Sequence, residues 1–455
     1  MEVHRTKQRT IGRPCDPRSI ERGVRQCLAD KVSGSLVGLW LLLPEHLRLG
    51  TWDLLCGWTG QATGTVAPRL AMQLVHEAAL CITGLREHRS LTQQEFNLAN
   101  GLPFVATDQA IHDLLEAHSI EHSQRLQIAL GQIRYSLGHF KATVLAIDPH
   151  RLCSYTKRQM PRQRKDLNKP PAKMLQAFFC LDAQSRQPLG FTLGSSARTV
   201  SQATPELLDL CAHIIPSSSP PALAMADCEH YTASLFEYAH RKGRFDLLVP
   251  MPSQPCTRRD LLDIPADHFH RRWSGYATFS RPYTMPRAPH LPLFQFIQRC
   301  GEPPKSCQYK AFLCTDQRDE VPALSVDYPA RWHIETFFDQ YQAHGWDKAR
   351  THNLHIRYGR MTMALFAQTA CFMMRQKLAE PFQRWDASHF SENFLRALDA
   401  DLRVHHDTLL VTFYNAPHSH LLRRHYENLP QKLQHEGISP NIPWLYDFKL
   451  DFRFK

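Results

Sequence analysis

Two short apolar runs, each ending in an aspartate, set the strongest limit on the fold of this chain. Val144–Ile147 precedes Asp148, and Ala222–Ala226 precedes Asp227. Runs of about four to eight apolar residues bounded by turn signals are typical of strands that are covered on both faces. A lone aspartate after such a run is usually a turn or cap residue. Ligand sites in open α/β sheets, however, lie beyond the carboxyl ends of strands, so both aspartates are candidates for one site.

A third carboxylate, Glu335, lies in a stretch with helical spacing. Its apolar side chains recur at i, i+3, i+4 and i+7: Ile334, Phe337, Phe338 and Tyr341. This stripe predicts an amphipathic helix that starts near Ala330, with Tyr328 extended because it precedes a proline. Arg331 lies one turn before Glu335, and the two could simply form a surface ion pair worth roughly 0.2–0.5 kcal/mol. With the two aspartates, however, Glu335 completes a set of hard oxygen ligands that suits Mg²⁺ or Mn²⁺ rather than zinc.

The charge of the chain favours a polyanionic partner. Its 455 residues include 54 Lys and Arg against 43 Asp and Glu, which gives a formal net charge of +11. Nucleic acid is therefore the leading candidate partner. The chain opens on no secretion signal, and its early apolar run, residues 36–43, is far shorter than a membrane span. The 13 cysteines include no Cys-x-x-Cys pair, so we expect a soluble cytoplasmic protein with reduced thiols and no membrane contact.

The N-terminal third has two predicted parts. Residues 1–25 form a basic arm, which is either a solvated tail or a phosphate-binding segment. Residues 26–140 have helical apolar spacing and few strand signals, which predicts an all-α DNA-binding domain. Within it, residues 92–103 and 107–116 have the pattern helix, turn, helix, with Thr107 as the N-cap of the second helix. A plain helical bundle gives the same pattern.

Residues 141–250 have the element order of a mixed sheet. The predicted strands are 144–147, 175–181, 188–193, 222–226 and 245–249, and the predicted helices are 204–214 and 232–242. With the Glu335 helix, this β-β-β-α-β-α-β order is that of a ribonuclease-H-like fold, in which the first and fourth strands are neighbours and bring Asp148 and Asp227 together. The segment between the first two strands is strongly basic. We expect its cations to contact DNA phosphates, chiefly Arg158, Arg162, Arg164 and Lys165.

Residues 251–314 are predicted to be a β-rich insertion in the catalytic domain, which resumes over 315–455. Basic and aromatic residues alternate in it, as around Arg271, Arg272 and Trp273. This composition suits single-stranded or distorted DNA, with Trp273 as a stacking platform, although an ordinary β-layer with an aromatic core has the same composition. Further on, residues 358–378 and 381–398 are predicted helical, and 408–413 and 448–454 are predicted strands, the last at a sheet edge.

The chain resembles DDE transposases of bacterial insertion sequences, in the branch with a β-rich insertion before the catalytic glutamate. Asp148 in Ala-Ile-Asp-Pro and Asp227 in Ala-Asp-Cys-Glu-His-Tyr look like the first two carboxylates of that family. Tyr328-x-x-Arg331-x-x-x-Glu335 matches its tyrosine, arginine and glutamate signature. The family's lysine seven residues after the glutamate is replaced by Gln342, and the nearest lysine is Lys348, which puts the phosphate contact of that lysine in doubt but not the metal site.

The resemblance implies metal-dependent DNA cleavage and strand transfer. Two Mg²⁺ ions, or Mn²⁺ in their place, would be held by Asp148, Asp227 and Glu335. Arg331 would bind a phosphate oxygen, and Tyr328 would donate a hydrogen bond to the DNA backbone. The implied partners are double-stranded DNA, as terminal inverted repeats and target, and a second copy of the chain in a homodimer at the nucleoid. Two alternatives remain open: another ribonuclease-H-like nuclease, and a domesticated DNA-binding protein without catalysis.

Overall fold

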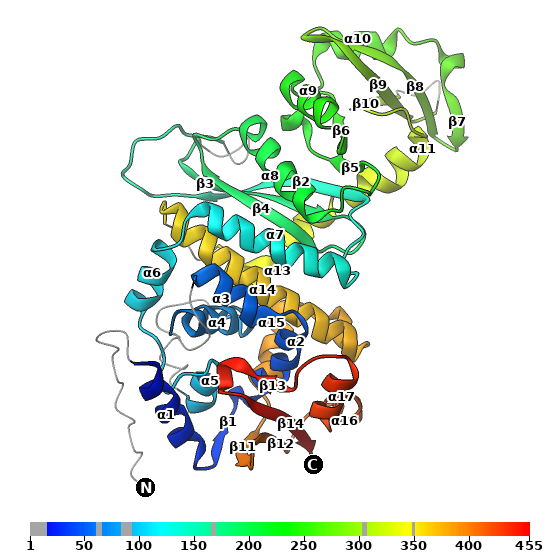
Figure 1. Ribbon diagram of the computed structural model, residues 1–455. Coiled ribbons are helices and arrows are strands. Elements are labelled where there is room, and N and C mark those ends of the chain that lie inside the picture. Colours follow the sequence, from blue (N-terminus) through cyan, green and yellow to red (C-terminus); the bar gives the residue numbers. More distant parts are fainter. Residues whose placement is uncertain (1–15, 61–65, 83–92, 165–169, 303–306, 348–350) are drawn as a thin grey trace. The chain divides into compact units, whose positions relative to one another are not determined.

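The computed structural model describes residues 16–60, 66–82, 93–164, 170–302, 307–347 and 351–455, and the chain divides into two compact units (Figure 1). One unit contains Met1–Leu130 and Gln340–Lys455, and the other is Gly131–Asp339. These limits differ from the predicted ones, because the segment from Gln340 onward clusters with the N-terminal helices and not with the strands that carry the aspartates.

The unit Gly131–Asp339 is built on a nine-stranded sheet in the order β4-β3-β2-β5-β6-β10-β9-β8-β7. Its strands are β2 (Val144–Cys153), β3 (Met174–Asp182), β4 (Pro188–Ser195), β5 (Ala222–Met225), β6 (Phe245–Pro250), β7 (His270–Trp273), β8 (Tyr276–Met285), β9 (Ala288–Cys300) and β10 (Gln308–Cys314). β2, β5 and β6 are parallel, and every other neighbouring pair is antiparallel. β2 and β5 are the first and fourth strands of the unit, so their predicted pairing is confirmed.

Two helices that follow β4 and β5 in the chain pack on this sheet. α8 (Val200–Ile214) packs against β3 and β4, and α9 (Ala233–Lys242) packs against β6. α8 begins four residues before the predicted Thr204 cap, because Thr199 and Gln202 form a capping box in which Gln202 accepts a hydrogen bond of 3.0 Å from the Thr199 N–H. α9 ends at Gly243, whose φ of +62° is the left-handed geometry that glycine supplies at a helix terminus.

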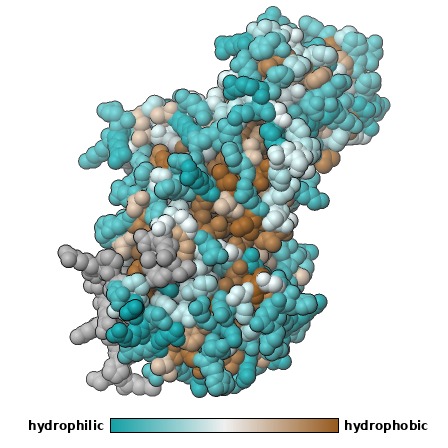
Figure 2. Space-filling view, viewed as in Figure 1, coloured by the Kyte–Doolittle hydropathy of each residue, from teal (hydrophilic) through white to brown (hydrophobic). Residues whose placement is uncertain are grey.

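The predicted β-rich insertion, residues 251–314, contains four strands that extend the same sheet. β10 pairs with β6 through Phe312 and Pro250, so the insertion is continuous with the rest of the sheet. Its own small core includes Leu261 from α10 (Pro255–Leu262) and Ile297 from β9. Figure 2 shows that the surface around α10 and β7 is mostly hydrophilic, in agreement with the four exposed residues of β7.

Helical turns fill the chain from Glu320 to Tyr341: α11 (Glu320–Pro322), η5 (Ala323–Asp327), α12 (Tyr328–Ala330) and α13 (His333–Tyr341). Tyr328 has φ −61° and ψ −40°, so the prediction that it is extended is wrong. η5 is a π-helical turn, which is wider than an α-helical turn, and it lies just before Tyr328 and Pro329. On α13, Phe337 and Phe338 pack on Phe179 of β3, with ring centroids 5.4 and 5.6 Å away, and Ile334 is buried. These three residues confirm their part of the predicted apolar stripe, whereas the side chain of Tyr341 lies outside the described part of the structure.

The other unit is built around one long helix, α14 (Leu354–Leu378), which packs against α4 (Val66–Ala79) and α6 (Asp108–Glu116). Its remaining helices are α1 (Pro17–Leu28), α2 (Leu43–Arg48), α3 (Thr51–Thr59), α5 (Gln94–Ala99), α15 (Ala387–Phe390), α16 (Ser419–Tyr426) and α17 (Leu429–His435). α7 (Ile120–Ser136) spans the boundary between the units. Thr107 caps α6 by accepting a hydrogen bond of 3.2 Å from the Ala110 N–H, as predicted.

A five-stranded sheet completes this unit in the order β1-β11-β12-β14-β13. Its strands are β1 (Val32–Gly34), β11 (Ala400–His405), β12 (Thr408–Phe413), β13 (Asn441–Ile442) and β14 (Phe448–Phe454). β1 pairs with β11, so the region 26–140 is not purely helical, and most of it shares one compact unit with the C-terminal segment. β14 lies between β12 and β13 and is not the edge strand that we predicted.

Two further predictions need correction. The basic arm does not extend to residue 25, because α1 begins at Pro17 and buries Ile20, Val24 and Leu28; residues 1–15 lie outside the described residues. The predicted helical stretch 381–398 is confirmed in part: it consists of η7 (Phe382–Arg384), α15 and η8 (Ser391–Leu395), with a break at Trp385 and Asp386. None of the helices in the described ranges is long and apolar enough to cross a membrane.

Candidate active site

Asp148 and Asp227 lie just beyond the point where the neighbouring parallel strands β2 and β5 stop pairing. The last register pair of β2 with β5 is Ala146 with Met225, and each aspartate stands two residues beyond that pair. Asp148 is still within β2, which continues to Cys153, whereas Asp227 lies past the end of β5 and caps the short turn η3 (Cys228–His230). The sheet topology therefore brings the two aspartates to the same end of the β2–β5 ladder, as predicted, but β2 is longer than the predicted strand 144–147 because it goes on pairing with β3.

The side chain of Asp227 is held by its own turn. Its Oδ1 accepts a hydrogen bond of 3.1 Å from the Glu229 N–H and one of 2.7 Å from Nδ1 of the buried His230. Both donors contact the same oxygen. They fix the orientation of the carboxylate, and neither of these contacts involves Oδ2.

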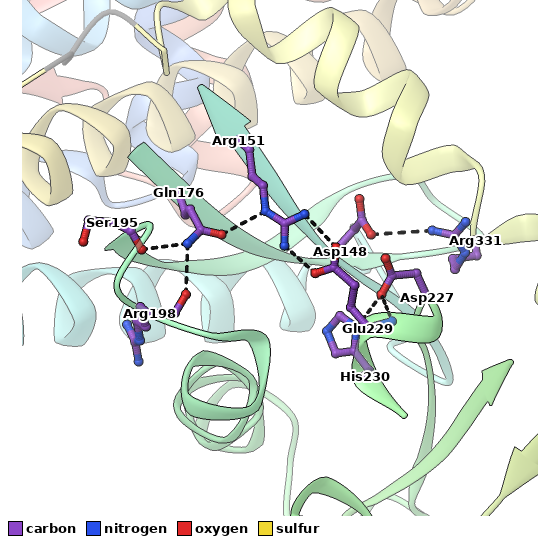
Figure 3. A network of polar contacts seen from close by, with 9 residues as sticks. All are labelled: Asp148, Arg151, Gln176, Ser195, Arg198, Asp227, Glu229, His230 and Arg331. Atoms are coloured by element: carbon purple, nitrogen blue, oxygen red, sulfur yellow. Dashed lines mark hydrogen bonds and ion pairs between the residues drawn. The ribbon is translucent and has the colours of Figure 1, made fainter. Parts of the chain in front are cut away.

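Arg331 joins the two carboxylates that come from β2 and α13. One guanidinium nitrogen lies 3.7 Å from Oδ1 of Asp148, and the other lies 3.6 Å from Oε1 of Glu335 (Figure 3 shows the Asp148 contact). Arg331 is only 8% exposed, so this is not the solvent-exposed pair that the sequence also allowed. Both contacts are longer than a strong charge-assisted hydrogen bond, which means that one cation neutralises two acids without binding either closely.

The pKa values of the aspartates reflect this crowding of negative charge. Burial and the neighbouring Asp227 raise the pKa of Asp148 to about 7, and Glu335 adds to the increase, while Arg331 opposes it. Burial would also raise the pKa of Asp227, but His230, Arg331 and the Glu229 N–H together hold it below its usual value. The site therefore has more negative charge than Arg331 compensates, and it favours an additional positive charge.

The donor chemistry fits a hard divalent cation, although the carboxylates are not gathered around one point. Across the described ranges, no three His, Cys, Asp or Glu side chains are grouped closely enough to hold a metal ion as they stand. The three carboxylates supply oxygen ligands of the type that Mg²⁺ and Mn²⁺ prefer. The side chain of Glu335 is 45% exposed, against 29% for Asp227 and 17% for Asp148, and it lies on a helix, so Glu335 is the ligand best able to move.

The other signature residues lie as follows. The hydroxyl of Tyr328 donates a hydrogen bond of 3.4 Å to the Ala226 carbonyl, next to Asp227, and its ring packs on Phe312 at 4.7 Å. The structure thus gives this hydroxyl a protein acceptor, and its predicted contact with DNA remains a prediction. Gln342 is exposed and belongs to the unit that contains α14, and Lys348 lies outside the described residues.

The basic segment between β2 and β3 exposes most of its predicted phosphate contacts. We use the name basic loop for its three exposed arginines: Arg158, Arg162 and Arg164. Lys165 lies outside the described residues. Lys173 is less available to bind a phosphate, because its Nζ already donates hydrogen bonds to the carbonyls of Thr156, at 2.9 Å, and Arg158, at 2.5 Å.

Trp273 lies at the surface of the β7–β8 hairpin. Its side chain is 48% exposed and stacks on Tyr276, with ring centroids 4.3 Å apart and planes 6° from parallel. The alternative that this tryptophan fills the core of a β-layer is therefore wrong. Its predicted role as a stacking platform for a base remains a prediction.

Sequence reasoning missed three polar residues that surround the aspartates: Arg151, Gln176 and Glu229. They form a connected network with Asp227, His230 and the β4 backbone (Figure 3). The available signal was the pair Glu229 and His230 directly after a strand-end aspartate, where polar residues commonly orient a functional carboxylate. Gln176 gave no signal, because its role depends on strand register.

No protein-family model matches the chain, and no curated protein matches it significantly. Among solved structures, the chain is similar to the cryo-EM structure of a piggyBac transposase synaptic complex with hairpin DNA. The identity is 12%, the TM-score is 0.38, and the match covers 82% of this chain and 80% of that chain. A TM-score this low carries no weight for the fold or the function of this chain.

Proposed function

We propose that this chain is a DDE-type transposase that cuts DNA at the ends of its own element and joins those ends to target DNA. One observation carries the proposal: Asp148 and Asp227 each lie two residues beyond the last pair of the parallel β2–β5 ladder, and Arg331 links Asp148 to Glu335. The strand order β4-β3-β2-β5-β6, with the two aspartates beside the central parallel pair, supports a ribonuclease-H-like catalytic core.

Asp148, Asp227 and Glu335 would hold two divalent cations, Mg²⁺ or Mn²⁺. Such ions, when bound, activate water or a 3′-hydroxyl and stabilise the leaving oxygen of an in-line displacement. The hydrogen bonds from His230 and from the Glu229 backbone hold Asp227 in one orientation before any ligand arrives. Arg331 is buried beside the acids. Once the acids are neutralised, it would bind a phosphate oxygen with its two terminal nitrogens.

The DNA would be held outside the carboxylates by cations and aromatic rings. The basic loop supplies exposed guanidinium groups, which bind phosphates of any sequence. The proposed substrates are terminal inverted repeats and a double-stranded target. Because two ends must be joined to one target, we propose that at least two copies of the chain act together.

The experiment that tests this function compares single substitutions of the three acids. Asp148→Ala, Asp227→Ala and Glu335→Gln should each abolish strand cleavage while DNA affinity stays unchanged or rises slightly, because the acids would hold cations in a site that also receives polyanionic DNA. Asp209→Asn, which alters an ion pair of α8 with Lys242, is the matched control and should cleave normally. Equal loss of binding and cleavage in well-folded variants would reject the assignment.

Cation dependence and product analysis separate this function from the alternatives. Activity should require Mg²⁺ or Mn²⁺, and Ca²⁺ should support binding with little cleavage; full turnover in EDTA would contradict the mechanism. Cleavage without joined products would favour another nuclease of the same fold. Specific binding without any cleavage by the unaltered chain would instead favour a DNA-binding protein that has lost catalysis.

A further inference from the structure

The segment that carries Asp227 leaves the sheet before it reaches the aspartate. Ladder hydrogen bonds between β2 and β5 end at Ala146 and Met225, and the last backbone contact of this segment with the sheet is the bond of 3.2 Å from the Ala226 N–H to the Leu248 carbonyl of β6. Beyond that point β2 continues alone beside β3. The backbone hydrogen bonds of the sheet therefore do not fix the distance between η3 and β2. Side-chain contacts can fix that distance.

One ion pair spans the gap between η3 and β2. Arg151, three residues after Asp148, donates from both terminal nitrogens to the two carboxylate oxygens of Glu229, which is two residues after Asp227. One of these contacts is 2.8 Å long, and the Arg151 side chain is only 15% exposed. Two parallel N–H···O bonds restrict rotation as well as distance, which a lysine in this position would not do.

Arg151 is itself held from the opposite side. Its Nε donates a hydrogen bond of 3.0 Å to Oε1 of the buried Gln176 on β3. The Gln176 amide nitrogen donates to the carbonyls of Ser195, at 2.7 Å, and Arg198, at 2.9 Å. Because these two carbonyls can only accept, they orient the amide so that its oxygen faces Arg151. The network therefore extends from the backbone after β4, across two strands, to the Asp227 turn (Figure 3).

We propose that Arg151 and Glu229 form a positioning pair that holds the Asp227 carboxylate opposite Asp148. Moving Glu229 would also move its backbone N–H, which donates to Oδ1 of Asp227. The inference rests on the proposed function, because it assigns the pair to the geometry of the same cation site. The pair also keeps the Glu229 carboxylate bound to an arginine, so that it does not compete with Asp227 for cations.

An ordinary ion pair would behave differently. A partly exposed ion pair usually contributes little to folding stability and has no further role. A positioning pair should instead change the affinity of the site for cations, since loss of a residue that orients a ligand commonly weakens metal binding about 10–100-fold. Cation affinity and thermal stability therefore separate the two roles.

The test is a Mn²⁺ titration of the full chain followed by electron paramagnetic resonance, which needs no DNA and no turnover. Glu229→Gln should weaken Mn²⁺ binding at least about tenfold while lowering the melting temperature by less than about 4 °C. The control is Asp209→Asn, because Asp209 is 42% exposed and Glu229 is 43% exposed, and each pairs with one cation. This control should bind Mn²⁺ like the unaltered chain.

A second variant keeps the test decisive if Glu229→Gln is unstable. Arg151→Lys retains the charge but removes the bidentate contact, and it should weaken Mn²⁺ binding to a similar degree. The exchanged pair Arg151→Glu with Glu229→Arg should recover part of the lost affinity. Unchanged Mn²⁺ affinity in Glu229→Gln or Arg151→Lys would overturn the inference, as would an equal loss in Asp209→Asn.

Failure of the inference differs from failure of the proposed function. If the unaltered chain and Asp227→Ala bind Mn²⁺ equally weakly, there is no cation site, and both proposals are refuted. If Asp227→Ala weakens binding and Glu229→Gln does not, the cation site stands and only the positioning role of the pair is refuted.

Discussion

Replacing Gly101 with alanine should destabilise the unit that contains α14 far more than a glycine substitution normally does. Gly101 follows α5 and has a φ of +70°. A Cβ at this position would lie 2.1 Å from the carbonyl oxygen of Trp444, a backbone atom that cannot move by itself. The segment that contains Trp444 docks at this point, since the Trp444 indole donates to the Ala99 carbonyl at 2.9 Å and the Tyr446 hydroxyl donates to the Gly101 carbonyl at 3.2 Å.

Two costs add up in this variant. The left-handed backbone conformation costs a residue with a Cβ about 1–2 kcal/mol. Relief of the clash requires Trp444 to shift, which breaks a buried hydrogen bond worth about 1 kcal/mol and disturbs the packing of a fully buried indole. We therefore expect Gly101→Ala to cost about 3–4 kcal/mol, a large part of the stability of a typical domain.

Gly437 provides the matched control. Its φ is +75°, and nothing lies within 4 Å of the position of an added Cβ, so Gly437→Ala should cost only the backbone term of about 1–2 kcal/mol. Differential scanning calorimetry of both variants measures the difference, which should place the Gly101→Ala transition about 4–8 °C below that of the control. Equal transition temperatures in the two variants would show that the contact between residue 101 and Trp444 does not constrain this unit.

Three further predictions concern DNA binding, the hairpin and acid stability. Neutralising the three arginines of the basic loop to glutamine should weaken binding to all DNA sequences alike and flatten the salt dependence by roughly 0.9 for each lost phosphate contact; a loss confined to one sequence would indicate base readout, and an unchanged slope would leave the loop without a role in binding. Trp273→Ala should leave stability and first-strand nicking nearly unchanged but slow the later step and reduce unstacking of a 2-aminopurine at the DNA end, because the exposed indole would stack on a base with about 1–3 kcal/mol; a parallel loss of both steps would contradict this role. Burial lowers the pKa values of His76 and His344 from 6.5 to about 4. Between pH 4 and 6.5 the unfolded chain therefore binds more protons at these two histidines than the folded chain does. The free energy of unfolding is thus fully retained above pH 6.5 and decreases as the pH falls toward 4. Denaturant unfolding at pH 7 and pH 5 should show a loss of about 2 kcal/mol for each histidine, and His344→Gln should remove its share of that loss; an unchanged pH dependence in that variant would contradict the assignment.

The sequence predicted the parts of the fold that depend on apolar periodicity. The pairing of β2 with β5 follows from two apolar runs, and the bounds of β12 and β14 agree with those predicted. Predictions failed where contacts between distant segments decide the local structure. β1 is a strand only because β11 pairs with it, and β14 is internal only because two residues of β13 pair with its other side.

Local signals also competed with one another around the helices. Thr204 and Pro205 form a good helix start, but Thr199 and Gln202 form a capping box that begins α8 earlier and places Pro205 inside the helix. Tyr328 precedes a proline, which disfavours helical geometry, yet the chain is already helical from Glu320 and stays helical through a wide turn. In both cases the neighbouring residues determine the local conformation: the capping box sets the start of α8, and the preceding helical turns keep Tyr328 helical. Which of two competing local patterns prevails depends on tertiary packing, which cannot be read from the local sequence.

The network around Asp227 illustrates why a site is harder to predict than its principal carboxylates. Arg151 reaches Glu229 because β2 extends seven residues beyond the end of its ladder with β5, at Ala146, and this length depends on pairing with β3. Gln176 faces Arg151 because the two are register partners on β2 and β3, thus directly opposite each other. A one-residue shift in that register would place Gln176 on the other face of the sheet and leave Arg151 without its anchor. The carboxylates can therefore be recognised from residue type and strand ends, whereas the groups that orient them can be recognised only when the register of three strands is known.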